Sequence, residues 1–197
     1  MVNQETNDLW HGFKSGDNDA LSKLYNLYVH KLFSYGLKIH GDEFLVKDCI
    51  QEVFIQLIDK RKKLTFSDAT PVYLFKSLRN KLLEELRSKH RRTDIVKSIS
   101  FGNINFEISA EQSIVYSEEE QLRIRMMDAA LNKLSDYQKE AIFLRYSQEL
   151  EYEEIAELLG IDIASARTLI YRSLKKVKES IFSKTEILLF FFRSLFG

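Results

Sequence analysis

The chain has one cysteine, one proline and seven glycines in 197 residues. Its single cysteine, Cys49, excludes a disulfide framework within the chain and favours a reducing compartment. So few chain-breaking residues favour long helices over a sheet that is rich in turns. The N-terminus has neither the basic segment nor the apolar core of a secretory signal, so we expect a cytoplasmic protein.

Long apolar runs and catalytic signatures are also missing. The longest apolar run, ILLFFF at residues 187–192, is far too short to cross a bilayer. The four histidines are scattered without metal-ligand spacing, and the sequence has no glycine-rich phosphate loop and no nucleophile elbow. The sequence therefore predicts a protein that is not an enzyme and needs no metal or other cofactor.

The net charge of zero conceals an uneven distribution. Residues 1–92 hold 16 Lys and Arg against 12 Asp and Glu, whereas residues 93–122 hold 1 against 6, and residues 123–197 hold 12 against 11. Positive charge collects in RSKHRR at residues 87–92 and again between Arg167 and Lys178. Two separate places could therefore bind a polyanion although the whole chain is not basic.

Apolar residues recur at three- and four-residue intervals through residues 8–60, again from Pro71 to about residue 90, and again from about residue 118. We expect Pro71 to open a helix, Gly41 to occupy the C′ position of another, and Ser135 to be an N-cap. Residues 91–117 lose the periodicity and suggest a linker. The pattern predicts an all-α fold of two small helical domains, residues 1–92 and 121–180, with a linker at 93–120 and an apolar extension at 181–197.

The most specific pattern lies in residues 152–178. Ile155, Leu158 and Leu159 form an apolar face, Ala156 is small where a second helix must approach, and Gly160 allows the left-handed residue that ends a helix. A second apolar stripe follows, made of Ala166, Ile170, Leu174 and Val177. Two amphipathic helices around a short glycine-led turn predict a helix-turn-helix.

The outward face of the second helix is basic and polar. It carries Arg167, Thr168, Tyr171, Arg172 and Lys175. Such donors suit the major groove, where base edges offer acceptors and phosphates line the rim. A solvated basic face is the alternative, but its coincidence with the glycine-led turn favours DNA binding. Lys175 and Lys176 could also position phosphates without reading bases.

Four stretches resemble one protein family. LNKLSDYQKEAIFLRYSQELEYEEIAELLGI and then SARTLIYRSLKKVK resemble region 4 of bacterial sigma factors. VKDCIQEVFIQL resembles region 2.2, and YLFKSLRNKLLEELR resembles regions 2.3 and 2.4. The resemblance covers about residues 8–90 and 121–179 and is to the extracytoplasmic function (ECF) group of the sigma-70 family. Tyr73, Glu84 and Leu169 depart from the family's usual Trp, Asp and basic residue, and the last change weakens the transfer of base contacts to that position.

The resemblance implies a sigma factor, which binds core RNA polymerase and directs promoter-specific initiation. Region 2 would handle the −10 element, through Tyr73, Lys76, Arg79, Asn80, Arg87, the loop at 64–70 and the RSKHRR run. Region 4 would read the −35 element through Ser165, Arg167, Thr168, Tyr171, Arg172 and Lys175. The polymerase would meet Asp48, Gln51, Glu52 and Gln56, and its flap would meet region 4 near Phe143 and Tyr146. The implied partners are core RNA polymerase, promoter DNA and an anti-sigma factor.

Several alternatives stay open at this stage. A helix-turn-helix regulator that acts without core polymerase would explain residues 152–178 but not the motifs at 48–54 and 73–87. A protein-interaction bundle would not explain the two basic patches. Asn80 could be a surface amide, the face around Asp48 could be merely solvated, and Phe75, Phe143 and Tyr146 could belong to the core. The apolar tail is expected to fold back as a helix on its own chain; the alternatives are an inhibitor-docking site or a clamp between the domains.

Overall fold

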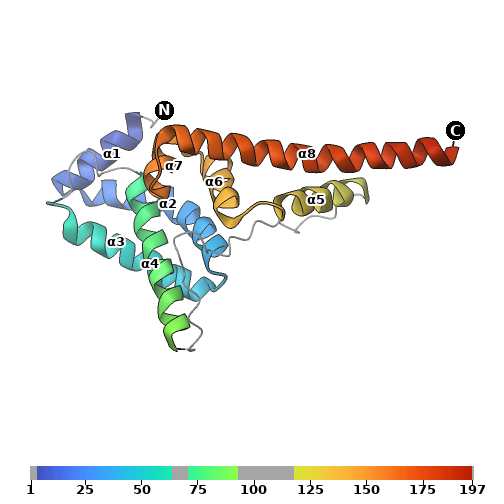
Figure 1. The fold of residues 1–197 in the computed structure, drawn as a ribbon. Coiled ribbons are helices and arrows are strands. Elements are labelled where there is room, and N and C mark those ends of the chain that lie inside the picture. The colour runs from blue at the N-terminus through green and yellow to red at the C-terminus, as the bar shows by residue number, and fades with distance from the viewer. Residues whose placement is uncertain (1–3, 64–70, 93–117, 197) are drawn as a thin grey trace. The chain divides into compact units, whose positions relative to one another are not determined.

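The computed structural model describes residues 4–63, 71–92 and 118–196 (Figure 1). Within these ranges the chain forms α-helices and no strand, which confirms the all-α expectation. The chain divides into two compact units, Met1–Ser100 and Phe101–Gly197. The first contains α1 (Gln4–Ser15), α2 (Asn18–Ile39), α3 (Glu43–Lys60) and α4 (Pro71–Arg92). The second contains α5 (Glu118–Leu131), α6 (Asp136–Tyr146), α7 (Tyr152–Leu159) and α8 (Ile163–Phe196).

In the first unit, α2, α3 and α4 pack against one another and α1 packs on α2. Aromatic rings join the helices: Tyr35 of α2 meets Phe75 of α4 edge-on with ring centroids 5.4 Å apart, and Trp10 of α1 meets Tyr28 of α2 at 6.5 Å. Phe75 is fully buried, so it belongs to the core. Burial also raises the pKa of the Cys49 thiol to about 11. This thiol is therefore protonated at neutral pH and is a poor nucleophile or metal ligand.

Gly41 follows the C-cap of α2, at the C′ position expected from the sequence, but without the left-handed conformation typical of a glycine there. Helix α2 ends at Ile39, and its C-cap, His40, has extended backbone at φ −141°. The residue after Gly41, Asp42, caps α3 by accepting hydrogen bonds from the backbone N–H groups of Phe44 and Leu45 at 3.1 and 3.2 Å. An N-cap residue needs extended backbone, so the chain passes straight from one helix into the cap of the next.

One glycine allows α2 and α3 to approach closely. A Cβ atom added to Gly36 would lie 2.6 Å from Cγ1 of Val46, and Val46 is fully buried. A β-branched side chain has few alternative rotamers, so Val46 cannot easily move aside. The absence of a side chain at Gly36 is therefore a packing requirement.

We expect Gly36→Ala to lower the free energy of unfolding by about 1–3 kcal/mol, the usual cost of overpacking, even though alanine favours helix formation. Urea unfolding followed by circular dichroism measures this change. Gly41→Ala is the matched control, because no atom lies within 4 Å of its added Cβ. Equal stabilities for the two variants would contradict the packing argument.

In the second unit, α5, α6 and α7 each pack on α8. Ser135 caps α6 in a reciprocal capping box with Gln138, as expected. Gly160 ends α7 in the left-handed conformation at φ 69°, also as expected. The start of α8 is held by Asp162, which accepts hydrogen bonds from the backbone and side chain of Ser165. These bonds lower the pKa of the Asp162 carboxyl.

The buried stripe of α8 differs from the predicted one at a single position. Leu174 is 38% exposed, and Ser173 is fully buried in its place. The buried residues are Ala166, Ile170, Ser173, Val177 and Ser180, whose spacing alternates between four and three residues. Ser173 tolerates burial because its hydroxyl donates to the carbonyl oxygen of Leu169 at 2.7 Å.

The tail does not fold back. Helix α8 continues through Phe196 as one element of 34 residues, and Figure 1 shows its red end running on in line with the rest of the helix. No glycine or proline lies between Gly160 and Gly197, so nothing in the sequence interrupts the helix. The side chains after Ile181 lie outside the described part of the chain. Among the described residues, no helix is both long and apolar enough to span a membrane.

Candidate nucleic-acid interface

The helix-turn-helix presents one face of α8 to solvent. Ile155, Ala156 and Leu158 of α7 are buried against the unit, and the buried stripe of α8 faces the same interior. The predicted −35 residues Ser165, Arg167, Thr168, Tyr171, Arg172 and Lys175 are all exposed. The structure therefore brings the whole predicted set to the surface of one helix, with Tyr171 67% exposed.

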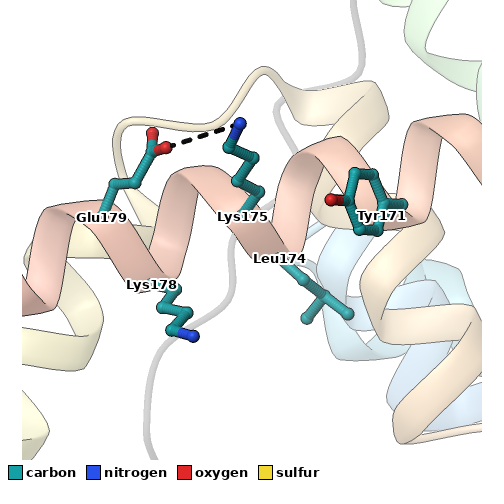
Figure 2. A pocket seen from close by; sticks show the side chains of 5 residues that line it. All are labelled: Tyr171, Leu174, Lys175, Lys178 and Glu179. Atoms are coloured by element: carbon teal, nitrogen blue, oxygen red, sulfur yellow. Dashed lines mark ion pairs between the residues drawn. The ribbon is translucent and has the colours of Figure 1, made fainter.

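Apolar surface accompanies the basic residues. An open hollow of about 550 Å³ is lined by Tyr171, Leu174, Lys175, Lys178 and Glu179 (Figure 2). Lys175 forms an ion pair with Glu179 at 3.9 Å, one turn further along α8. Both side chains of that pair are well exposed, so the pair is weak and a phosphate could replace the carboxylate.

A second hollow, of about 450 Å³, lies between the starts of α6 and α8. Its lining from α8 and the preceding turn is Ile161, Ala164, Ser165, Thr168, Leu169 and Arg172. Leu169, where the resemblance led us to expect a basic residue, is half-buried here. It therefore places an aliphatic side chain beside the polar groups of Thr168 and Arg172.

Arg167 is held by neighbouring side chains. Its Nη2 atom donates to Oε1 of Glu153 at 3.3 Å, and its guanidinium lies 5.4 Å from the centre of the Tyr152 ring. The guanidinium of Arg145 lies 4.8 Å from the centre of the same ring. Arg145 in turn donates to the Leu150 carbonyl at 2.8 Å and to Glu151 at 2.9 Å. The sequence reasoning missed this network because its members are scattered over α6, α7 and α8.

The predicted −10 residues on α4 do not share one environment. Lys76 and Asn80 are exposed, and Tyr73 and Arg87 are partly buried. Arg79 is only 3% exposed, which argues against direct contact with DNA. It lies in the stripe of Val72, Phe75 and Leu82, which faces the core. A buried guanidinium requires partners within the protein, so we interpret Arg79 as a structural residue. The loop at 64–70 and the side chains of Lys89–Arg92 lie outside the described residues.

The predicted polymerase-binding residues lie on the solvent side of α3. Asp48, Gln51, Glu52 and Gln56 are all exposed, opposite the buried residues Val46, Cys49, Ile50, Val53, Phe54 and Leu57. Glu52 also pairs with Lys81 of α4, and its carboxylate raises the pKa of that lysine. Glu52 thus links two helices in addition to facing solvent.

Three apolar residues on the same side of α3 were missed. Phe44 is 81% exposed, Ile55 is 48% exposed, and Ile58 is also exposed. Together with Asp48 and Gln51 they follow the spacing of four and three residues that defines one helix face. Exposed apolar groups clustered on one face are typical of a protein-binding surface. In the sequence they were indistinguishable from core residues, because the apolar pattern of α3 covers both sides.

The two aromatic residues of α6 that could meet the polymerase flap differ in burial. Phe143 is buried and belongs to the core, whereas Tyr146 is exposed and stays a candidate for a contact with the polymerase flap. Among the described residues, no group of His, Cys, Asp and Glu is arranged to hold a metal ion.

Comparison with known proteins identifies the two units. The family model for sigma-70 region 2 matches residues 24–92, and the model for sigma-70, region 4 matches residues 124–177. The chain therefore belongs to the sigma-70 family of RNA polymerase sigma factors, in its ECF group.

Individual relatives cover most of the chain. It is 24% identical over 160 residues to the ECF RNA polymerase sigma factor SigM of Bacillus subtilis, and the match covers 81% of this chain and 93% of SigM. It is 22% identical over 170 residues to the RNA polymerase sigma factor YlaC of the same organism, with 85% and 95% covered. The solved structure of the sigma factor RpoE in complex with the anti-sigma factor NepR, from Bartonella quintana, shares the fold with a TM-score of 0.58 at 21% identity, covering 81% of this chain and 95% of RpoE.

The exposed face of α3 gives a prediction about polymerase binding. We expect Asp48→Ala combined with Ile55→Glu to weaken binding to core RNA polymerase by more than about tenfold, because both side chains are exposed on this face. Glu52 is left unchanged because it pairs with Lys81.

Pull-down with purified core polymerase measures the effect, and the thermal unfolding curve should stay unchanged. Leu27→Glu is the control, since Leu27 is 44% exposed but lies on α2. If the α2 variant lost binding equally, or the α3 variant bound normally, the assignment of this face would be wrong.

Proposed function

We propose that this protein binds core RNA polymerase and directs transcription from specific promoters by recognising −10 and −35 elements. The observation that carries the proposal is the pair of sigma-70 segments in the family's order, each with an exposed face suited to its role. The protein contributes binding energy and geometry, while the polymerase performs the bond chemistry. Such a factor acts in the cytoplasm, where promoter DNA and polymerase are found.

Each unit has a separate task in this proposal. Residues 1–92 act as region 2, with α3 against the polymerase and the exposed residues of α4 near the −10 element. Residues 121–180 act as region 4, with α8 in the major groove of the −35 element. Arg167, Thr168, Tyr171 and Arg172 are the proposed readers, and Lys175 positions a phosphate. A partly melted −10 element suits stacking and amide groups, which Tyr73 and Asn80 offer.

Regulation by an anti-sigma factor is a further part of the proposal. The solved relative RpoE was crystallised with the anti-sigma factor NepR, and it shares its fold with this chain. A partner of this kind must prevent polymerase or promoter binding, so it would cover the exposed faces of α3 or α8.

Transcription in vitro tests the main proposal. Core polymerase with this protein should yield specific transcripts from genomic fragments with mapped start sites, and core polymerase alone should not. A regulator that acts without polymerase would instead bind its operator tightly as the isolated protein. Absence of both co-elution with core and specific transcripts would refute the sigma-factor function.

The recognition residues give a second prediction. We expect Arg172→Ala and Arg167→Ala each to weaken −35 binding by about 1–3 kcal/mol, the usual value of a lost base contact. Polymerase binding should survive both changes, since α3 is untouched. Arg125→Ala, an exposed arginine on α5, is the matched control. The measurement is promoter binding by the holoenzyme at a fixed salt concentration. Unchanged binding by both α8 variants would show that other residues read the −35 element.

A further inference from the structure

The environment of Arg167 bears on how α8 could select a base. Its guanidinium is 5.4 Å from the centre of the Tyr152 ring and is hydrogen-bonded to Glu153 at 3.3 Å. Both of these residues belong to the first turn of α7, whereas Arg167 belongs to α8. The first helix of the motif therefore holds a side chain of the second.

The Tyr152 ring is itself well fixed. Arg145 approaches it at 4.8 Å and is anchored by hydrogen bonds to Leu150 and Glu151 at the start of α7. Glu151 and Glu154 further secure this end of α7 by a reciprocal capping box. The position of the Tyr152 ring therefore depends on the packing of α6 and α7. The flexible side chain of Arg167 contacts a ring that is already fixed.

A guanidinium on an aromatic ring keeps its hydrogen-bonding capacity. The attraction to the ring is electrostatic, whereas hydrogen bonds are made by the five N–H donors, which lie in the plane of the guanidinium. The Glu153 bond, made by Nη2 between two exposed side chains, adds a weaker constraint on the rotation of that plane. The remaining donors are free to pair with a base edge, and the bidentate bond to O6 and N7 of guanine is the commonest specific contact of arginine.

We propose that Tyr152 and Glu153 are positioning residues that hold Arg167 for the readout of a guanine at one position of the −35 element. The inference rests on the proposed function and deepens it. In this proposal each residue acts by limiting the orientations of Arg167. Loss of the ring should therefore reduce the preference for guanine at that one position by about two- to fivefold, the scale of an exposed cation–π contact.

The experiment uses holoenzyme made from core polymerase and the full chain, with a promoter library randomised across the −35 element. Arg167→Ala first identifies the position whose guanine preference depends on Arg167. The Tyr152→Leu variant should lose the preference for guanine at that position and keep the base preferences at the other positions. The Tyr152→Phe variant should retain the preference for guanine, because the ring is kept. Glu153→Gln should give a smaller loss, while Glu157→Gln, which removes the same charge one turn further along α7, should give none.

A double variant separates positioning from a general structural role. With Arg167→Ala already present, adding Tyr152→Leu should change nothing further, because its effect passes through Arg167. Loss of preference at every position, further loss in the double variant, or no effect of Tyr152→Leu would each overturn the proposal. A wild-type holoenzyme without any −35 preference would instead show that the proposed function itself is wrong.

Discussion

The packing of one side of α8 against α5, α6 and α7 is the interaction on which the second unit depends. Ala166, Ile170, Ser173 and Val177 are buried on that side, and small residues at two of these positions allow close approach of the neighbouring helices. Because a helix is rigid, burial of this side fixes which residues face outward. The arginines and Tyr171 are exposed for the same reason that Ile170 is not.

The same constraint governs the first unit, with one instructive difference. On α3, burial of Val46, Val53 and Leu57 leaves a solvent face that mixes carboxylates and amides with Phe44 and Ile55. On α4, the buried stripe includes a charged residue, Arg79. A basic side chain can occupy a buried stripe in place of an aliphatic one if the protein supplies partners for its charge. Its position in the helix, and not its chemistry, decides that Arg79 faces inward.

Ion pairs within the chain moderate the basic surfaces. Arg167 pairs with Glu153, Lys175 with Glu179, and Lys81 with Glu52. Each pair places a carboxylate beside a cationic side chain, so part of the positive charge is already offset within the chain. DNA phosphates must compete with carboxylates already in place, so binding should depend on geometry as well as on total charge. The acidic first turn of α7 thus provides a partner for Arg167 of α8.

The sequence by itself determined the all-α class, the helix-turn-helix and the family, because periodicity, Ser135, Gly160 and the motifs are local features. It also identified the exposed set on α8, since those residues lie opposite an apolar stripe. Only the tertiary structure decided between equivalent helical registers. Ser173 is buried instead of Leu174, and Arg79 is buried while Ile55 is exposed. The contact of Arg167 with Tyr152 and Glu153 likewise joins two helices, and helical spacing within either one carries no information about it.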